Sequence, residues 1–347
     1  MRLRHCNALA MMDDGTTGTQ DYDERTTIND LRKEEIMSEL RDGLLRLKSN
    51  LVEVIRGKEG VIDQLLIALL ADGHILIEDV PGTGKTTLAK ALAVSLTAGF
   101  SRIQFTPDLL PTDIIGGMVY SSADGSFTFR PGPIHANIVL VDEINRASPR
   151  TQSALLEAMS ERQVTIEGET RFLPSPFWVV ATQNPIEHNG TYPLPEAQLD
   201  RFSMRISLGY PEHQYEVQLL NDQEFVHPLS KVTAVMDTAL LASIQQEVKK
   251  VEVEASVLDY IVRLVGKTRK DERLRLGASP RGALDLRRCA QAAAFLDDRN
   301  AVRPSDVQRF AVPVLAHRLI VEVKAKHSGL TGEMVVEEIV KSESVPA

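Results

Sequence analysis

The sequence predicts an α/β protein: a mostly parallel sheet with helices on both faces, followed by a smaller helical domain. Two observations lead to this fold class. Between residues 74 and 210, short apolar runs bounded by Gly, Pro, Asn or Asp alternate with helical patterns. Such alternation is typical of a parallel sheet covered by helices. Beyond Pro211 the helical periodicity continues without a strong strand signal, so that part of the chain is expected to be helical.

Five apolar runs, each rich in branched residues, are expected to form the strands: HILIEDV, RIQF, NIVLVDE, FWVVATQ and RISLGY. Helical patterns fit between them at 85–97, 149–160 and 195–202. Between the second and third strands, residues 116–135 alternate apolar and polar side chains around the pair Asp124-Gly125. An Asp-Gly pair within such alternation favours a tight hairpin turn, so we expect a β-hairpin inserted into the α/β core.

The same patterns divide the chain into four expected regions. Residues 1–30 are polar, acidic and without periodicity, which predicts a disordered N-terminal tail. The α/β domain is expected at 31–211, because apolar residues recur at helical steps from Leu31 onward. Helical patterns at 212–222, 255–268, 281–297 and 304–320 place the helical domain at 212–330 and leave 331–347 as a C-terminal tail.

Composition argues against several classes of protein. The net charge of -9 and the aromatic content of 5% argue against a general nucleic-acid binder. The two cysteines, Cys6 and Cys289, show neither a disulfide framework nor metal-ligand spacing, which favours a reducing compartment. Because no apolar run approaches eighteen residues and no signal-peptide core is evident, we expect a cytoplasmic protein without a membrane span.

The stretch EDVPGTGKTT at 78–87 nearly fits the phosphate-loop pattern G-x-x-x-x-G-K-[ST], but Asp79 stands in the first glycine position. An apolar strand precedes it and a helical pattern follows. In that context backbone N–H groups and a helix N-terminus converge on phosphate oxygens. Gly82 and Gly84 would let the backbone approach closely, Lys85 would reach the β- and γ-phosphates, and Thr86 would ligate Mg²⁺. The alternative is an ordinary glycine turn with a surface lysine.

Two further strands end in polar residues. NIVLVDE ends in Asp142 and Glu143, which suit a Mg²⁺ ligand and a general base, or else a solvated loop. FWVVATQNP ends in Thr182, Gln183 and Asn184, where an amide could bind a γ-phosphate or position water; a turn opened by Asn184-Pro185 is the alternative. Parallel strands end on the same edge as the phosphate loop, so these residues are expected to meet there.

Together these segments resemble the AAA+ ATPases and, among them, the MoxR family, over roughly residues 31–330. The resemblance rests on these pieces: GHILIEDVPGTGKT, RIQFTPDLLPTDIIGG, FRPGPIHANIVLVDEINRASPRTQSALLEAM, VVATQNPIEHNGTYPLPEAQLDRF and GASPRG. It implies an AAA+ P-loop NTPase core with a parallel five-stranded sheet, followed by a small all-α lid domain. The hairpin at 116–135 corresponds to the helix-2 insert shared by the MoxR, magnesium-chelatase and MCM branch. In this family the non-glycine residue at Asp79 is an accepted form.

The resemblance also implies roles for single residues. The Walker A residues that would bind nucleotide are Pro81, Gly82, Thr83, Gly84, Lys85, Thr86 and Thr87. Asp142 and Glu143 match Walker B, with Asp142 and Thr86 as the Mg²⁺ ligands and Glu143 as general base. Asn184 matches sensor 1.

Two arginines are also implied. Arg201 in AQLDRF matches the arginine finger, which reaches the ATP of the neighbouring subunit, and Arg281 in GASPRG matches sensor 2. Alternatives stay open for both. Arg205 could be the finger while Arg201 pairs with Asp200, and Arg281 could be a helix-start residue that only bonds the sheet domain.

The function implied is that of a Mg²⁺- and ATP-dependent, chaperone-like remodeller that works as a homo-oligomer, expected to be a hexameric ring. Family members assist maturation of, or metal-cofactor insertion into, client proteins, often with a partner that carries a von Willebrand factor A domain. A trans arginine is worth about 10³–10⁵ in rate, so assembly would switch hydrolysis on. Two alternatives remain: a nucleotide-gated scaffold with little turnover, and a DNA translocase, against which the acidic balance argues.

Overall fold

The computed structural model describes residues 38–80, 82–123, 125–185, 190–223 and 228–346. Contacts divide the chain into two units, residues 1–43 and 44–347, and the second unit contains every element discussed below. The expected N-terminal tail at 1–30 lies outside the described residues. Of the helices in the described ranges, none is both long enough and apolar enough to cross a membrane.

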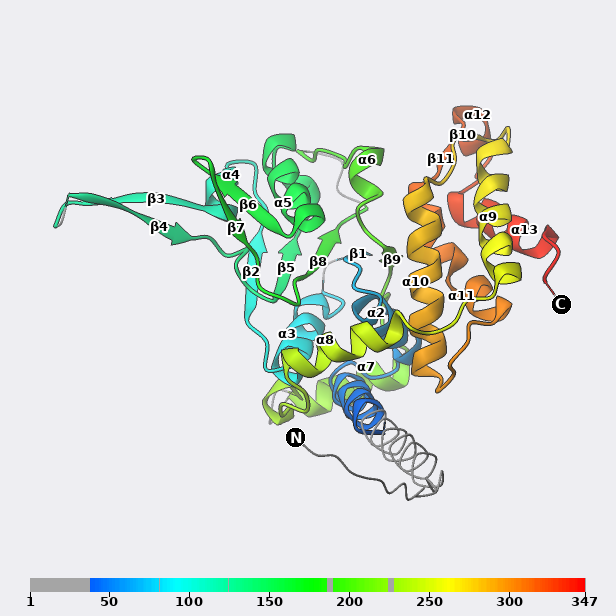
Figure 1. Cartoon of the computed structure of the whole chain (residues 1–347), viewed down its shortest axis with the longest axis horizontal. Helices are drawn as coiled ribbons and strands as arrows, with labels where there is room; N and C mark the ends of the chain where they lie inside the picture. Colours follow the sequence, from blue (N-terminus) through cyan, green and yellow to red (C-terminus); the bar gives the residue numbers. More distant parts are fainter. Residues whose placement is uncertain (1–37, 81, 124, 186–189, 224–227, 347) are drawn as a thin grey trace, which may run out of the picture. The chain divides into compact units, whose positions relative to one another are not determined.

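A five-stranded sheet forms the centre of the second unit (Figure 1). In spatial order its strands are β2 (Phe100–Gln104), β5 (Ile138–Asp142), β8 (Trp178–Gln183), β1 (Ile75–Glu78) and β9 (Met204–Ile206). Every neighbouring pair is parallel. The five runs predicted as strands are these five strands, and the predicted parallel sheet is confirmed.

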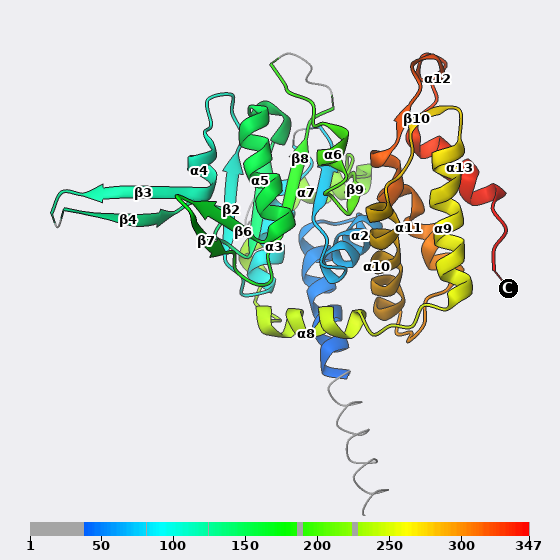
Figure 2. The ribbon, with the colours of Figure 1, turned by 45° about the horizontal axis from the view of Figure 1, so that its top comes forward.

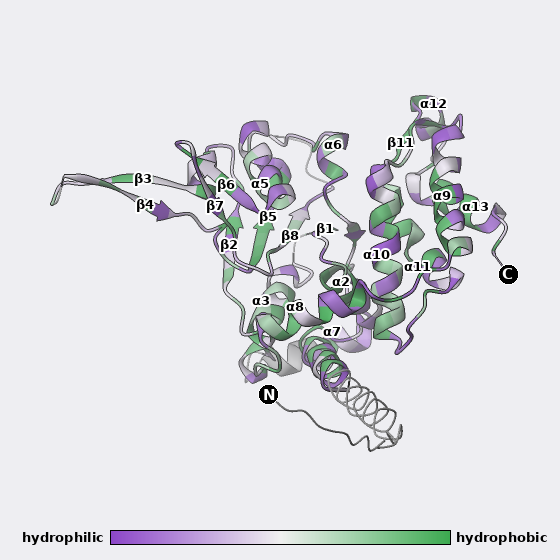
Figure 3. Ribbon diagram, in the orientation of Figure 1, coloured by the Kyte–Doolittle hydropathy of each residue, from purple (hydrophilic) through white to green (hydrophobic). Residues whose placement is uncertain are grey.

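Helices cover both faces of the sheet. Helix α5 (Pro149–Glu161) lies against one face of the sheet (Figure 2). Its Leu155 packs with Val139 and Val179 in a single buried cluster. Helix α3 (Lys85–Ser95) contacts β5 without contributing to that cluster. Burial on both faces explains why β5 reads as the continuous apolar run IVLV. Figure 3 shows the same hydrophobic character in β5 and in helix α2 (Glu59–Leu70).

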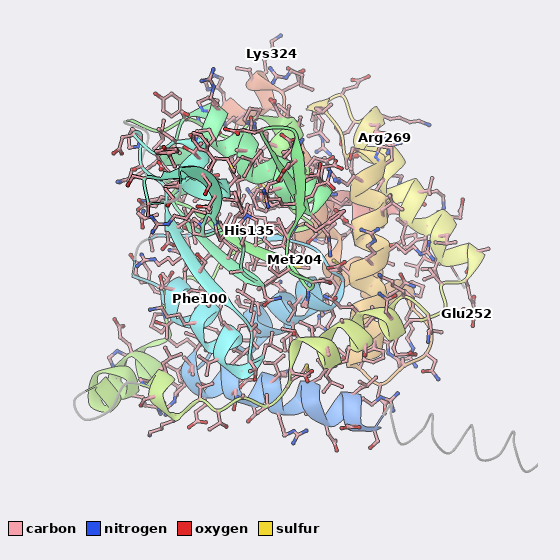
Figure 4. All side chains as sticks on the ribbon, turned by 60° about the vertical axis from the view of Figure 1, so that its left-hand side comes forward. Phe100, His135, Met204, Glu252, Arg269 and Lys324 are labelled. Carbon is pink, nitrogen blue, oxygen red and sulfur yellow. The ribbon has the colours of Figure 1, made fainter. Side chains whose placement is uncertain are left out.

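The edge strand β9 is covered by the helical region. Helix α11 (Pro304–Leu315) contacts β9, and Met204 of that strand is fully buried. In Figure 4, Met204 lies within the packed side chains, whereas Lys324 on helix α12 (Val323–His327) points outward. A covered edge offers no free strand to another chain, which removes an aggregation hazard.

The expected inserted hairpin is present. β3 (Gly116–Ser121) pairs antiparallel with β4 (Ser126–Pro131) after the short helix α4 (Pro111–Ile115), and its Tyr120 and Phe127 are exposed. At its base the two strands nearly touch. A Cβ built on Gly116 would lie 2.4 Å from the carbonyl oxygen of Arg130, and one on Gly132 would lie 2.3 Å from that of Ile114. Only glycine fits at this crossing.

A second hairpin was not expected. β6 (Gln163–Ile166) pairs antiparallel with β7 (Glu169–Phe172), directly after α5. The guanidinium of Arg171 lies 4.1 Å from the ring centre of Phe129 on β4, within cation–π range, so the two hairpins contact each other. Both lie on the side of the sheet away from the last helices (Figures 1 and 2).

The region after β9 is helical, as expected. Its longer helices are α7 (His213–Gln223), α8 (Thr238–Val248), α9 (Ala255–Lys270), α10 (Pro280–Leu296), α11 and α13 (Gly332–Ser342). Two departures are small: α8 has no counterpart among the expected helices, and β10 (Leu274–Leu276) pairs with β11 (Ile320–Val321) as a short ribbon.

The expected C-terminal tail at 331–347 differs from the structure. It contains helix α13, whose Val335, Val336 and Ile339 are buried and which contacts α9 and α11. Apolar residues three and four positions apart made this segment amphipathic, so it packs as part of the helical region. The boundary at 211–212 stays a prediction, because both sides of it belong to the same contact unit.

His74, immediately before β1, is a buried neutral histidine. The backbone N–H of Val179 donates to its Nδ1 at 3.0 Å, so its Nε2–H is free to donate to the carbonyl of Met159 at 3.1 Å. Burial lowers the pKa of His74 to about 4. The protonated form is therefore disfavoured in the folded protein.

We expect this histidine to make the protein acid-sensitive. Between its folded pKa of about 4 and an unfolded value of about 6.5, the unfolded chain binds more protons, so the free energy of unfolding falls as pH falls. At pH 5 the free energy of unfolding should be lower by about 2 kcal/mol through this histidine. Denaturant unfolding at pH 7 and pH 5 measures the decrease. The decrease should be smaller by this amount in His74→Gln, and it should equal that of wild type in His213→Gln, an exposed control. Equal losses in wild type and His74→Gln would contradict the assignment.

Candidate nucleotide site

The loop between β1 and α3 begins at the carboxyl end of β1. Gly82 and Gly84 have φ values of 87° and 90°, a conformation that side chains strain. Apart from its chain neighbours, a Cβ on Gly82 would meet no atom of the described residues within 4 Å, so the space beside the loop is open at this position. Gly84 is the N-cap of α3, and Thr86 and Thr87 lie in its first turn. Pro81 lies outside the described residues, and Thr83 is half-buried in the loop.

Lys85 lies close to the acidic residues of the neighbouring strand. Its Nζ donates to the carbonyl oxygen of Val80 at 2.6 Å. Burial lowers the pKa of its ammonium group, while the charges of Asp79, Asp142 and Glu143 act in the opposite direction. The fold thus brings the predicted Walker A lysine within electrostatic reach of both predicted Walker B carboxylates.

Asp142 ends β5 and is 6% exposed. Arg102 Nε donates to its Oδ2 at 2.6 Å, and the hydroxyl of Thr182, on the adjacent strand β8, donates to its Oδ1 at 3.3 Å. The same hydroxyl accepts the backbone N–H of Glu143 at 2.9 Å. Thr182 therefore fixes the two carboxylate residues relative to each other.

Glu143 has a left-handed backbone, with φ 57° and ψ 52°. This conformation is uncommon for a non-glycine residue and is found where surrounding contacts enforce it, often at functional sites. Its carboxylate accepts a hydrogen bond from Gln104 Nε2 at 2.8 Å and lies 3.2 Å from Arg146 Nε. The sequence did not single out Arg102, Gln104 or Arg146. Arg102 and Gln104 share a two-residue spacing along β2, which places both on one face of the strand.

Asn184 follows β8, the strand that lies between β5 and β1. It is 7% exposed. Its neighbour Gln183 pairs with Glu78 in the sheet and accepts the backbone N–H of Asp79 at 3.1 Å. Asn184 therefore stands at the same sheet edge as the loop and Asp142. We call Lys85, Asp142, Glu143 and Asn184 the carboxyl-edge site.

Arg201 and Arg281 lie elsewhere. Both line a cavity of about 390 Å³, which we call the amino-edge pocket, together with further cationic side chains: Arg162, Lys249 and Arg288. Residues 71–74 also line it, and they precede β1, whereas the phosphate loop follows it. Four strand residues span about 13 Å, so the pocket and the loop occupy opposite edges of the sheet. The structure does not bring Arg201 or Arg281 to Lys85.

The partners of Asp200 bear on the alternatives for Arg201. The carboxylate of Asp200 accepts the Ser279 hydroxyl at 2.9 Å and lies 3.6 Å from Nε of Arg318. Arg318 is buried and also donates to Asp285 at 2.6 Å. Asp200 thus joins the segment that carries Arg201 to the start of α10, which carries Arg281.

Arg205 lies on β9, away from the amino-edge pocket. It pairs with Glu78 at 2.8 Å and with Glu333. With Glu78 and Glu333 it lines a different cleft, of about 640 Å³, together with Gly57 and Lys58. Two carboxylates of its own subunit thus already bind its guanidinium, and the choice between Arg201 and Arg205 as finger stays a prediction.

This cleft adjoins the phosphate loop. Ile55 lies beside Gly84, because a Cβ there would be 3.4 Å from Ile55 Cδ1. Lys58 Nζ donates to the carbonyl of Tyr210 at 2.7 Å, so the segment 55–58 connects the loop with the chain that leaves β9. No motif or spacing in the sequence pointed to these residues.

Comparison with known proteins agrees with this architecture. The family described as "ATPase family associated with various cellular activities (AAA)" matches residues 74–204, and the AAA lid domain matches residues 266–339. An uncharacterized Bacillus subtilis protein, YeaC, is 49% identical over 84% of this chain and 92% of its own length. "Chaperone MoxR1" of Mycobacterium tuberculosis is 41% identical over 84% of this chain and 80% of its own length.

Two further comparisons cover still more of the chain. "Protein MoxR" of Methylorubrum extorquens is 30% identical over 92% of this chain and 100% of its own length. A crystal structure of a candidate ATPase from Cytophaga hutchinsonii superposes with a TM-score of 0.86 at 37% identity, over 92% of this chain and 100% of that one. The sheet order, the inserted hairpin, the lid and these relatives agree, and the chain belongs to the MoxR-type AAA+ ATPases.

Proposed function

We propose that this chain binds ATP with Mg²⁺ and hydrolyses it at a site shared by two subunits of a homo-oligomer. One observation carries the proposal. The carboxyl-edge site holds a phosphate loop and two carboxylates, while the cationic side chains Arg201 and Arg281 lie at the opposite edge of the sheet. Each subunit therefore presents complementary halves of a phosphoryl-transfer site on different sides.

At the carboxyl edge, backbone N–H groups of the loop and the N-terminus of α3 would bind the phosphate oxygens. Lys85 would exchange its bond to the Val80 carbonyl for a phosphate oxygen. The nucleoside would lie in the adjoining cleft of about 640 Å³, beside Gly57 and Lys58.

The donors present fit Mg²⁺ delivered with the nucleotide. Among the described residues, no cluster of three or more His, Cys, Asp or Glu could hold a metal by itself. Mg²⁺ is commonly held by one or two protein carboxylates together with substrate phosphates, and Thr86 and Asp142 supply such a partial set. When bound, the ion neutralises charge on the transferred phosphoryl group.

Glu143 would accept a proton from the attacking water. Its strained backbone and its contacts with Gln104 and Arg146 hold the carboxylate in one place, and a base must lie within hydrogen-bond reach of the proton it takes. Asn184, at the same edge, would orient that water or a γ-phosphate oxygen.

Arg201 and Arg281 would act on the nucleotide of the next subunit. Because the two half-sites lie at different edges, the contact is head-to-tail, and a head-to-tail contact that closes gives a ring. A ring of six is the form we propose. The trans arginine would contribute about 10³–10⁵ in rate.

The work that hydrolysis drives is proposed from the relatives. One relative is named a chaperone, which supports a remodeller or maturation factor for client proteins in the cytoplasm. Metal-cofactor insertion and a partner with a von Willebrand factor A domain are part of this proposal. The competing scaffold would show phosphate release that stays flat as protein concentration rises. A DNA translocase would show salt-dependent DNA binding with stimulated hydrolysis.

The proposal is tested by Lys85→Ala. The loss of a charged hydrogen-bond donor should weaken ATP binding by about 10–100-fold. Lys90→Ala, on the exposed face of the same helix, is the matched control and should bind ATP as wild type does. Calorimetric titration with ATP and Mg²⁺ gives the affinities. Phosphate release by wild type should rise cooperatively with protein concentration; ATP binding that is unaffected by Lys85→Ala would overturn the site.

A further inference from the structure

Asp79 occupies the position where the general phosphate-loop pattern has its first glycine, and it is 7% exposed. Its carboxylate accepts three backbone N–H groups. Val80 donates to Oδ1 at 2.8 Å, while Leu208 and Gly209 donate to Oδ2 at 2.9 and 2.7 Å. A glycine in this position could accept none of them.

These three donors belong to two different segments. Val80 opens the phosphate loop, whereas Leu208 and Gly209 follow β9 on the chain that leads into the helical region. The carbonyl oxygen of the next residue, Tyr210, accepts a hydrogen bond from Nζ of Lys58, a residue that lines the adjoining cleft, at 2.7 Å. A single carboxylate therefore ties the start of the phosphate loop to the segment that connects sheet and helices.

The choice of a carboxylate here is unexpected on electrostatic grounds. A negative charge beside a polyphosphate site opposes the binding of an anion. Hydrogen bonds from N–H groups to an ionised acceptor are about twice as strong as neutral ones, and a buried donor left unpaired costs about 1–3 kcal/mol. Leu208 is 2% exposed, so its N–H has little access to water as a substitute partner.

We propose that Asp79 is a positioning residue, which fixes the start of the phosphate loop to Leu208 and Gly209 and so orients the loop before ATP binds. The inference rests on the proposed ATP-binding function. It makes the departure from the glycine pattern a requirement of this fold. Restoring that glycine should accordingly damage the site.

The test is the substitution Asp79→Gly, with Asp79→Asn as the milder change. We expect Asp79→Gly to raise the Kd and the KM for ATP at least tenfold, with kcat at saturating ATP within about threefold of wild type, because positioning acts before chemistry. Asp79→Asn retains only one acceptor oxygen, so its Kd and KM for ATP should lie between those of wild type and Asp79→Gly. Amide hydrogen exchange should be faster at Leu208 and Gly209 in both variants, and ATP should slow it in wild type only.

Asp306→Asn is the matched control. Asp306 is 5% exposed and accepts the N–H of Arg303 at 2.8 Å, but it lies in the helical region. Its substitution should lower thermal stability and leave the Kd for ATP unchanged. If Asp79→Gly binds ATP as tightly as wild type does, the inference is overturned. If that variant does not fold, ATP binding by Asp79→Asn that is as tight as in wild type overturns it instead. A wild-type protein that binds no ATP would instead overturn the proposed function.

Discussion

Glu143→Gln should stop ATP turnover and leave ATP binding intact. The substitution removes the proposed proton acceptor but keeps the size of the side chain and an oxygen that Gln104 can still reach. General base catalysis contributes typically about 10²–10⁴-fold, so kcat should fall by that factor. Because the left-handed backbone of residue 143 is unchanged by the substitution, the fold should keep its thermal stability.

Single-turnover phosphate release and ATP titration separate the two effects. Glu157→Gln, an exposed glutamate on α5, controls for the loss of one negative charge. Turnover by Glu143→Gln within a few-fold of wild type would remove Glu143 from the role of base. A parallel loss of ATP affinity would mean that the residue holds the loop and does not act on water.

Arg201→Ala should lower hydrolysis by about 10³–10⁵, which is roughly 4–7 kcal/mol of barrier. The loss should leave ATP affinity nearly unchanged, because the arginine lies at the amino edge and its own subunit's loop lies at the carboxyl edge. Arg281→Ala should act in the same direction. Both variants should still assemble at high protein concentration.

Mixing inactive variants shows whether the site is shared. Glu143→Gln subunits carry intact arginines, and Arg201→Ala subunits carry an intact base, so mixed assemblies contain some complete sites. With random mixing in equal amounts, about one quarter of the interfaces should be complete and activity should return to about that fraction. No recovery would contradict a shared site.

A second mixture decides the place of Arg281. If Arg201 and Arg281 act together across one interface, no interface between Arg201→Ala and Arg281→Ala subunits is complete, and their mixture stays inactive. If Arg281 serves its own subunit's nucleotide, the same mixture recovers activity. The amino-edge pocket predicts the first result.

Much of the carboxyl-edge site could be predicted from the sequence, because its parts are local. The strand, glycine loop and helix around Lys85 form one continuous segment, and Asp142 and Asn184 each end an apolar run. Parallel strands bring such ends to one edge regardless of the rest of the fold. That rule explains why Asp142 and Asn184, about forty positions apart in the chain, were expected at the same edge of the sheet.

The remainder depends on tertiary placement. The motif GASPRG does not indicate which sheet edge the start of α10 faces. The structure was therefore needed to show that Arg281 and Arg201 line the same pocket. In the sequence, Gln104 is only a polar residue in a predicted strand. Its contact with Glu143 depends on the order of the strands in the sheet. The segment expected to be a tail, 331–347, contains helix α13, which packs against α9 and α11. This packing could not be predicted, because those helices are distant from α13 in sequence.

The crossing of Gly116 and Gly132 has a consequence for how the inserted hairpin relates to the ATPase core. The chain leaves the core and returns to it at one point, with backbone atoms too close for any side chain between them. Whatever happens to the length or chemistry of the hairpin beyond that point, the spacing of its two attachment points stays the same. The inserted hairpin can therefore change by insertion, deletion or exchange of its exposed aromatic residues, while the strands of the five-stranded sheet keep their register.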